Sequence, residues 1–147
     1  MRSALLIFGI VAIASGAHAT DYKKPALHGD YYFYTYAEKN GRPVCSETWR
    51  FGEDGTLTIR SGQEIATNHF RTEPGEKIMT VLFRSFVSSN GQPDCSGAVN
   101  SHPPPGAEER LESYFAQDGG IVLCEKGMAG STPVLRPIGH LFAAKSN

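Results

Sequence analysis

The feature that most constrains this chain is its turn chemistry. Asn-Gly and Asp-Gly pairs recur along it because glycine, and an asparagine or aspartate before it, tolerate the positive φ angles of tight hairpins. The four pairs are Asn40-Gly41, Asp54-Gly55, Asn90-Gly91 and Asp118-Gly119. Ser61-Gly62 and Pro74-Gly75 add two further breaks. A chain punctuated in this way favours short antiparallel strands.

Short runs rich in aromatic and β-branched residues lie between these breaks and predict about eight strands. The predicted strands are Asp30–Ala37, Val44–Phe51, Thr56–Arg60, Glu64–Thr72, Lys77–Ser88, Glu109–Ala116, Ile121–Glu125 and Val134–Phe142. No convincing helical periodicity follows residue 19. Because a single open sheet would expose two unpaired edges, closure is favoured. We therefore predict an all-β fold, an antiparallel up-and-down β-barrel of about eight strands.

The first 19 residues have the pattern of a secretory signal peptide. Arg2 precedes an almost wholly apolar run, and Ala17-His18-Ala19 offers a small-x-small cleavage site. We expect cleavage near Ala19, one β-barrel domain over 20–147, and a periplasmic or secreted location. No later apolar run approaches the roughly 18 residues of a membrane-spanning helix. The balance of 14 basic and 15 acidic side chains excludes a basic nucleic-acid binder.

Three cysteines in an exported chain predict one disulfide and one remaining thiol. The pair Cys95–Cys124 closes the shortest loop, so we predict that bridge, although the other two pairings stay open. Cys45 would then be a small buried apolar side chain.

Gly29-Asp30-Tyr31 opens the first predicted strand, and Arg136 lies in the last one. In these residues the chain resembles the lipocalin-like (calycin-type) barrels of exported proteins. A Gly-x-Trp signature opens the first strand of that family, with tyrosine here in place of tryptophan, and an arginine of the last strand packs over that ring. The resemblance implies a barrel with one open mouth and a pocket or loop rim that binds another molecule.

The surplus of aromatic residues suggests a cavity for a small apolar or amphipathic ligand. Aromatic and histidine side chains offer flat apolar bodies and hydrogen-bonding tips for this purpose. The candidate ligand-binding residues are Tyr32, Tyr34, Trp49, His69, Phe70 and Phe83. Simpler readings remain for these residues: an ordinary barrel wall, a buried floor at Trp49, and a solvated outer face at His69.

The long connection between Ser88 and Glu108 supports a second hypothesis. His102, Pro103, Pro104 and Pro105 form a proline-stiffened segment that loses little entropy when it enters a cleft. The chain is then an inhibitor or immunity protein that blocks a periplasmic cell-wall hydrolase through this loop. An open cavity favours the ligand carrier, whereas a filled barrel with a free loop favours the inhibitor.

Enzymatic activity is not expected from the motifs. The sequence contains no nucleophile elbow, phosphate-binding loop or Cys-x-x-Cys pair, and the histidines lack metal-ligand spacing. These histidines after the signal are His28, His69, His102 and His140. We therefore predict a non-enzymatic binding protein without catalytic residues, metal or cofactor.

Overall fold

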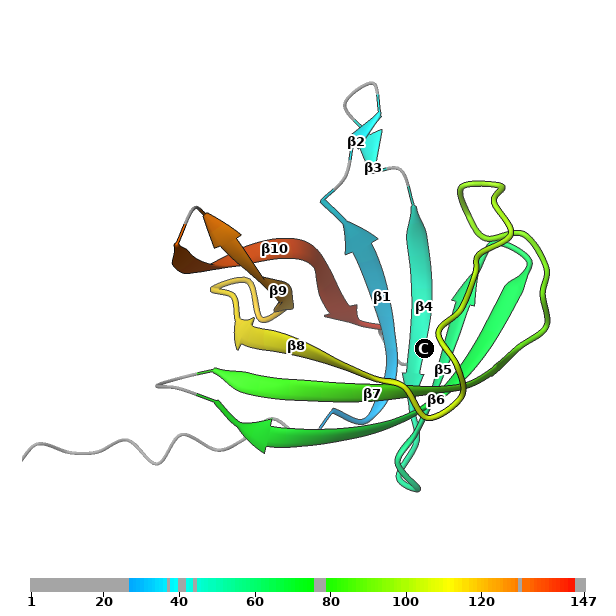
Figure 1. Ribbon diagram of the computed structural model, residues 1–147, viewed down its shortest axis with the longest axis horizontal. Coiled ribbons are helices and arrows are strands. Elements are labelled where there is room, and N and C mark those ends of the chain that lie inside the picture. The colour runs from blue at the N-terminus through cyan, green and yellow to red at the C-terminus, as the bar shows by residue number, and fades with distance from the viewer. Residues whose placement is uncertain are drawn as a thin grey trace, which may run out of the picture.

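The computed structural model describes residues 27–36, 38–39, 42–43, 45–75, 79–129 and 131–144. The predicted signal peptide and the Asn40-Gly41 turn lie outside these residues. The described chain is all-β (Figure 1). The barrel strands are β1 (Gly29–Thr35), β4 (Ser46–Phe51), β5 (Thr56–Ser61), β6 (Glu64–Pro74), β7 (Thr80–Ser89), β8 (Glu108–Phe115), β9 (Ile121–Ala129) and β10 (Thr132–Ala143). A separate two-stranded hairpin joins β2 (Glu38–Lys39) to β3 (Arg42–Pro43).

The eight barrel strands form one closed antiparallel sheet in the order β1-β10-β9-β8-β7-β6-β5-β4. The first strand closes it, since Tyr31 is opposite Ala143 of β10 on one side and Trp49 of β4 on the other. Closure leaves the barrel without free sheet edges. The predicted up-and-down barrel and its eight strands are confirmed. Among the described residues no helix is long and apolar enough to cross a membrane.

Glycines in left-handed conformations close three of the barrel hairpins. Gly55, Gly62 and Gly119 have φ angles of 79°, 60° and 83°, as the sequence pairs predict. Gly91 also has a positive φ, 68°, but it opens the long loop after β7 and closes no hairpin. The same dipeptide chemistry therefore serves both tight turns and the start of a longer connection.

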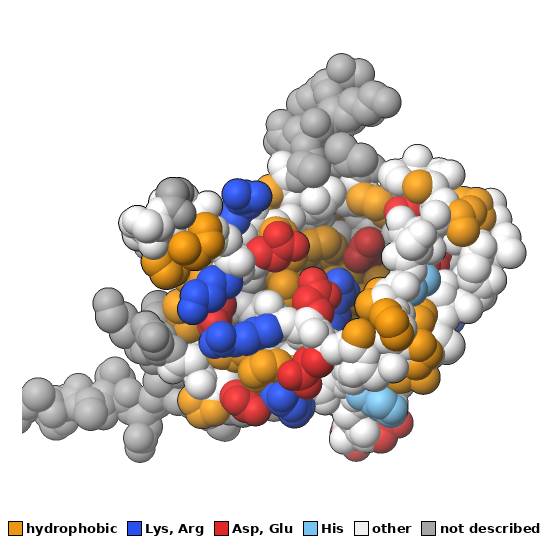
Figure 2. Space-filling model, in the orientation of Figure 1, with side chains coloured by type: hydrophobic (Ala, Val, Ile, Leu, Met, Phe, Trp, Pro, Cys, Tyr) orange, Lys and Arg blue, Asp and Glu red, His pale blue; other side chains and the backbone are white. Residues whose placement is uncertain are grey.

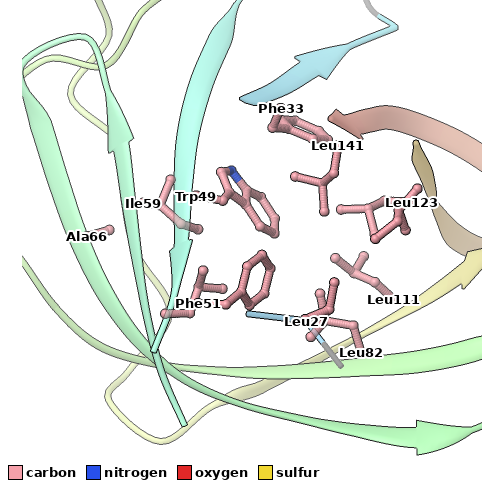
Figure 3. Close-up of a cluster of buried hydrophobic side chains, with 12 residues drawn as sticks. Leu27, Phe33, Trp49, Phe51, Ile59, Ala66, Leu82, Leu111, Leu123 and Leu141 are labelled. Atoms are coloured by element: carbon pink, nitrogen blue, oxygen red, sulfur yellow. The ribbon is translucent and has the colours of Figure 1, made fainter. Parts of the chain in front are cut away.

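Alternation along each strand builds a core in one half of the barrel. Trp49 and Phe51 of β4 point inward, where Figure 3 shows them facing leucine side chains of the opposite wall. Leu27, which precedes β1, lies beside Phe51 and Leu82 (Figure 3). Phe51 and Leu82 are at most 1% exposed. The end of the barrel at which β4 ends and β5 begins is thus filled with side chains.

The disulfide joins Cys45 to Cys95, so the predicted Cys95–Cys124 bridge is wrong. Cys124 alternates with Ile121 and Leu123 of the core along β9, and is therefore on the outer face of the barrel wall, where it is buried as a free thiol. Cys95 instead lies next to Ser61 at the end of β5. The entropy of loop closure changes slowly with loop length, so the shorter loop of a Cys95–Cys124 bridge gives it only a small advantage. The position of Cys95 next to the end of β5 decides the pairing instead.

Arg136 does not pack over Tyr31, contrary to what the lipocalin resemblance implies. It is exposed and pairs in register with Glu125, whereas Tyr31 is opposite Ala143 near the other end of β10. Tyr31 instead meets Phe51 edge to face inside the barrel, with ring centroids 5.5 Å apart.

Candidate functional site: a cavity beneath a loop

A cavity of about 390 Å³ lies at the end of the barrel opposite the filled core. Figure 2 shows this face hollowed, with hydrophobic side chains in the recess and charged side chains around it. The apolar lining comes from Phe33, Trp49, Ile59, Ala66, Phe86, Leu111 and Ile138. The polar lining from the barrel comes from Glu47, Ser61, Glu64, Asn68, Arg84 and Glu109. The long loop contributes Asn100, Ser101, His102, Pro103 and Ala107.

The mixed lining follows from a change in side-chain type along the inward face of single strands. In β4 the inward positions pass from Phe51 and Trp49 to Glu47 as the strand approaches the cavity. In β7 they pass from Leu82 to Arg84. Alternation points all of these side chains into the same barrel interior. The end lined by leucines is closely packed, whereas the end lined by polar groups contains space for solvent or a ligand.

Residues 90–107, called the lid below, fold back against the start of β6. The N–H groups of Gln63 and Glu64 both donate to the Pro93 carbonyl oxygen at 3.0 Å. The Cys45–Cys95 disulfide then fastens the lid to the chain just before β4. Ser61 supports this join, because its Oγ accepts a hydrogen bond from the Cys95 N–H at 3.2 Å. The lid is therefore tied to the barrel wall by covalent and backbone contacts.

Glu64 is the polar centre of the contact between lid and barrel. It is only 5% exposed and its carboxylate accepts hydrogen bonds from Ser89 Oγ at 3.0 Å and Asn100 Nδ2 at 3.1 Å. His102 Nε2 lies 2.5 Å from the same carboxylate. The His102 ring also stacks on Phe86, with centroids 4.5 Å apart. These contacts aim His102 into the barrel.

The lid also has a turn of its own, centred on Asp94. Asp94 Oδ1 accepts hydrogen bonds from the Ser96 hydroxyl at 2.6 Å and the Ala98 N–H at 3.0 Å, and Oδ2 accepts one from Asn100 Nδ2 at 3.0 Å. These donors, the Ser96 hydroxyl first, lower the pKa of Asp94 from 3.8 to about 2. Asn100 therefore connects the Asp94 turn to Glu64.

Acidification should loosen the lid through Asp94. Its folded-state pKa of about 2 lies below the ordinary value of 3.8, so the ionised carboxylate stabilises the lid above about pH 4, and that contribution is lost as the pH falls through about 2. We expect the NMR signals of the lid amides to change between these pH values. Asp94→Asn should remove most of that change. An unaltered acid response in the variant would contradict this role.

Arg84 and Glu47 flank the Trp49 ring. The Arg84 guanidinium forms an ion pair with Glu109 and lies 5.3 Å from the Trp49 ring centroid. Glu47 Oε2 accepts a hydrogen bond from the indole Nε1 of Trp49 at 2.7 Å. The Trp49 side chain is 2% exposed and is thus held at the boundary between the filled core and the cavity.

Of the six predicted ligand-binding residues, Trp49 lines the cavity. The other five are not among the residues that line it. Tyr32 and Tyr34 are 47% and 39% exposed on the outside of β1, where Phe33 is the inward residue. His69 is exposed on the outer face of β6.

The two predicted phenylalanines also lie away from the cavity. Phe70 faces the interior but packs edge to face on Phe51, 5.0 Å between centroids, in the filled half. Phe83 is on the outer face of β7, with the Arg71 guanidinium 3.7 Å above its ring. Period-two alternation separates Phe83 from Arg84 and Phe86, which do line the cavity, whereas Phe70 is opposite Arg84 and shares its inward face.

The proline-rich segment is divided between the two surfaces of the lid. His102 and Pro103 line the cavity, whereas Pro104 and Pro105 do not, and all three prolines are exposed. Sequence reasoning missed the charged lining residues, Glu47, Glu64, Arg84 and Glu109. A usable signal was present in β4, since Glu47 shares a face with Trp49 and Phe51.

Three potential metal-ligating atoms, from Cys45, Glu47 and Cys95, lie within 4.8 Å of one another. The two cysteines are bonded to each other, so neither offers the thiolate that a metal ion would require. This group is therefore a consequence of the disulfide and gives no metal site.

Comparison with protein-family models, with curated proteins and with solved structures finds no match for this chain. The eight-stranded antiparallel barrel is compatible with a lipocalin-like fold. Any function assigned to it must be argued from the cavity and the lid.

Proposed function

We propose that this is an exported, non-enzymatic binding protein that holds a small amphipathic molecule in the barrel, beneath the lid. The observation that carries the proposal is the cavity of about 390 Å³, one wall of which is a loop that is fastened at several points. Ligand sites commonly measure roughly 300–1,000 Å³ and combine apolar walls with a few placed polar groups. The Trp49 floor and the carboxylates around it give this combination.

The barrel and the disulfide support the lipocalin-like and exported parts of this proposal. A closed barrel of eight strands has an interior just wide enough to fill with side chains or to hold one small ligand. A disulfide is compatible with an oxidising compartment outside the cytosol, which the predicted signal peptide also indicates.

The lid favours a ligand carrier over an inhibitor of a cell-wall hydrolase. Its His102 side chain is turned into the protein's own cavity and held there by Glu64 and Phe86. A segment used to enter the cleft of a partner would present this side chain outward. The interior is also hollow beside the lid, which is the arrangement expected of a carrier.

Filling the cavity should abolish binding without unfolding the barrel. Ala66 is an inward residue of β6 whose side chain borders the cavity, so Ala66→Phe places a ring in empty space. We expect at least about a tenfold loss of affinity for a neutral naphthalene probe such as naphthylethanol, equivalent to about 1.4 kcal/mol. Calorimetric titration measures the affinity, and thermal unfolding should show an unchanged or higher Tm.

Thr67→Phe is the matched control, since the next residue of β6 points to the outer face. It should leave probe binding unchanged. Overpacking a filled core costs about 1–3 kcal/mol, so a marked fall in the stability of Ala66→Phe would show that the interior is not open. Failure of the wild-type protein to bind any apolar or amphipathic probe would refute the proposed function.

A further inference from the structure

Glu47 is the one charged residue of the cavity wall that contacts neither an arginine, a lysine, a histidine nor an opposite charge among the described residues. It accepts a hydrogen bond from the Trp49 indole through Oε2. Within the part of the chain that the structure describes, no lysine, arginine or histidine pairs with it, and its Oε1 accepts no hydrogen bond. One carboxylate oxygen of this lining residue therefore has no protein partner among the described residues.

The other charged groups of the cavity already have side-chain partners. Arg84 pairs with Glu109, and Glu64 is in contact with His102, Ser89 and Asn100. The cavity wall therefore carries an excess of negative charge at Glu47. A half-buried carboxylate attracts a cation more strongly than one fully surrounded by water.

Aromatic side chains lie on one side of this carboxylate. Trp49 lies beside it, and Phe33 lies against Trp49 with ring centroids 5.1 Å apart. Ile138 and Ile59 also border the cavity. A molecule that satisfies this arrangement needs a positive group at one end and an aromatic or branched apolar body at the other.

We infer that the ligand is an organic cation, a primary or secondary ammonium attached to an apolar body. This inference rests on the proposed function and specifies its ligand class. The ammonium donates to Glu47 Oε1, and the apolar body lies against Phe33, Trp49 and Ile138. The same carboxylate repels anionic ligands of equal shape, which gives the cavity its charge selectivity.

Three probes with one ring system test this inference: naphthylethylammonium, neutral naphthylethanol and anionic naphthylacetate. Titration calorimetry at neutral pH and low salt should show the ammonium binding roughly 10- to 100-fold more tightly than the alcohol, as a charge-assisted hydrogen bond predicts. The carboxylate probe should bind more weakly than the alcohol.

Glu47→Gln should abolish this preference, because glutamine keeps an acceptor for the Trp49 indole and loses the charge. We expect the affinity for the ammonium to fall to within about threefold of that for the alcohol, with binding of the alcohol unchanged. Glu53→Gln is the matched control. It makes the same change in net charge at a side chain that is 87% exposed, in the turn beyond the filled end.

Equal binding of ammonium and alcohol by the wild-type protein, or a preference that survives Glu47→Gln, would overturn the inference and leave binding in the cavity intact. Binding of none of the three probes would instead refute the proposed function itself. Binding of the alcohol by the variant shows that it is folded. Should the variant fail to fold, the order of affinities in the wild-type protein still decides.

Discussion

Replacing both Cys45 and Cys95 with alanine should lower the free energy of unfolding by about 4 kcal/mol, the largest single effect that we expect. The disulfide spans a sequence separation of 50 residues, and a loop of that size restricts the unfolded chain by about this amount. The bridge also holds the lid to the start of β4, so the double variant should bind the neutral probe more weakly. Denaturant unfolding and calorimetric titration measure the two effects.

Cys124→Ala is the control for this prediction. The Cys124 thiol is buried on the outer face of the sheet, and burial, with the nearby Glu112 carboxylate, raises its pKa. It should therefore resist alkylation in the native protein, and its replacement should cost only about 1 kcal/mol. Peptide mapping without reduction should recover Cys45 linked to Cys95, and a bridge that contains Cys124 would contradict the structure.

Glu64→Ala should lower the free energy of unfolding by about 2 kcal/mol and release the lid. The substitution removes the buried carboxylate that Ser89, Asn100 and His102 share, and hydrogen bonds to charged groups are each worth about 1.5–3 kcal/mol. Part of the lost free energy is recovered, because Asn100 is exposed and can form hydrogen bonds with water instead. Hydrogen exchange should accelerate in the lid while the core strands β8 and β9 stay protected.

Glu73→Ala removes an exposed carboxylate and is the comparison for Glu64→Ala. Glu73 pairs with Arg71 at 2.7 Å, but the two side chains are 55% and 49% exposed. Such surface pairs contribute about 0–1 kcal/mol because water and salt screen them. Equal losses in the two variants, or unchanged exchange in the lid of Glu64→Ala, would show that Glu64 does not hold the lid.

These experiments separate the two devices that fasten the lid. The disulfide and the Pro93 carbonyl contacts hold its first half, whereas Glu64 and the stack on Phe86 hold the segment that enters the cavity. A ligand must pass the second segment or the open side of the recess. Loosening at Glu64 should therefore alter binding rates more directly than a change in the barrel wall.

The sequence by itself determined the barrel. Turn glycines such as Gly55 and Gly119 place the chain reversals, and alternation such as that of Leu57 and Ile59 assigns one face of each strand to the interior. Both signals are local, since a positive φ and a period of two depend on neighbouring residues only. The inward face of β1, in contrast, could not be assigned from the sequence, because both of its faces carry aromatic residues. Phe33 proved to face the core, whereas Tyr32 and Tyr34 face outward.

Only the tertiary structure decided the cysteine pairing and the cavity lining. Cys95 reaches Cys45 because the lid returns along the start of β6, and Glu47, Glu64 and Arg84 meet because inward positions of separate strands share one end of the barrel. This proximity depends on the register of strand pairing and on closure of the whole sheet. A shift of one strand by one residue would turn all of its side chains to the other face. No local pattern carries that information.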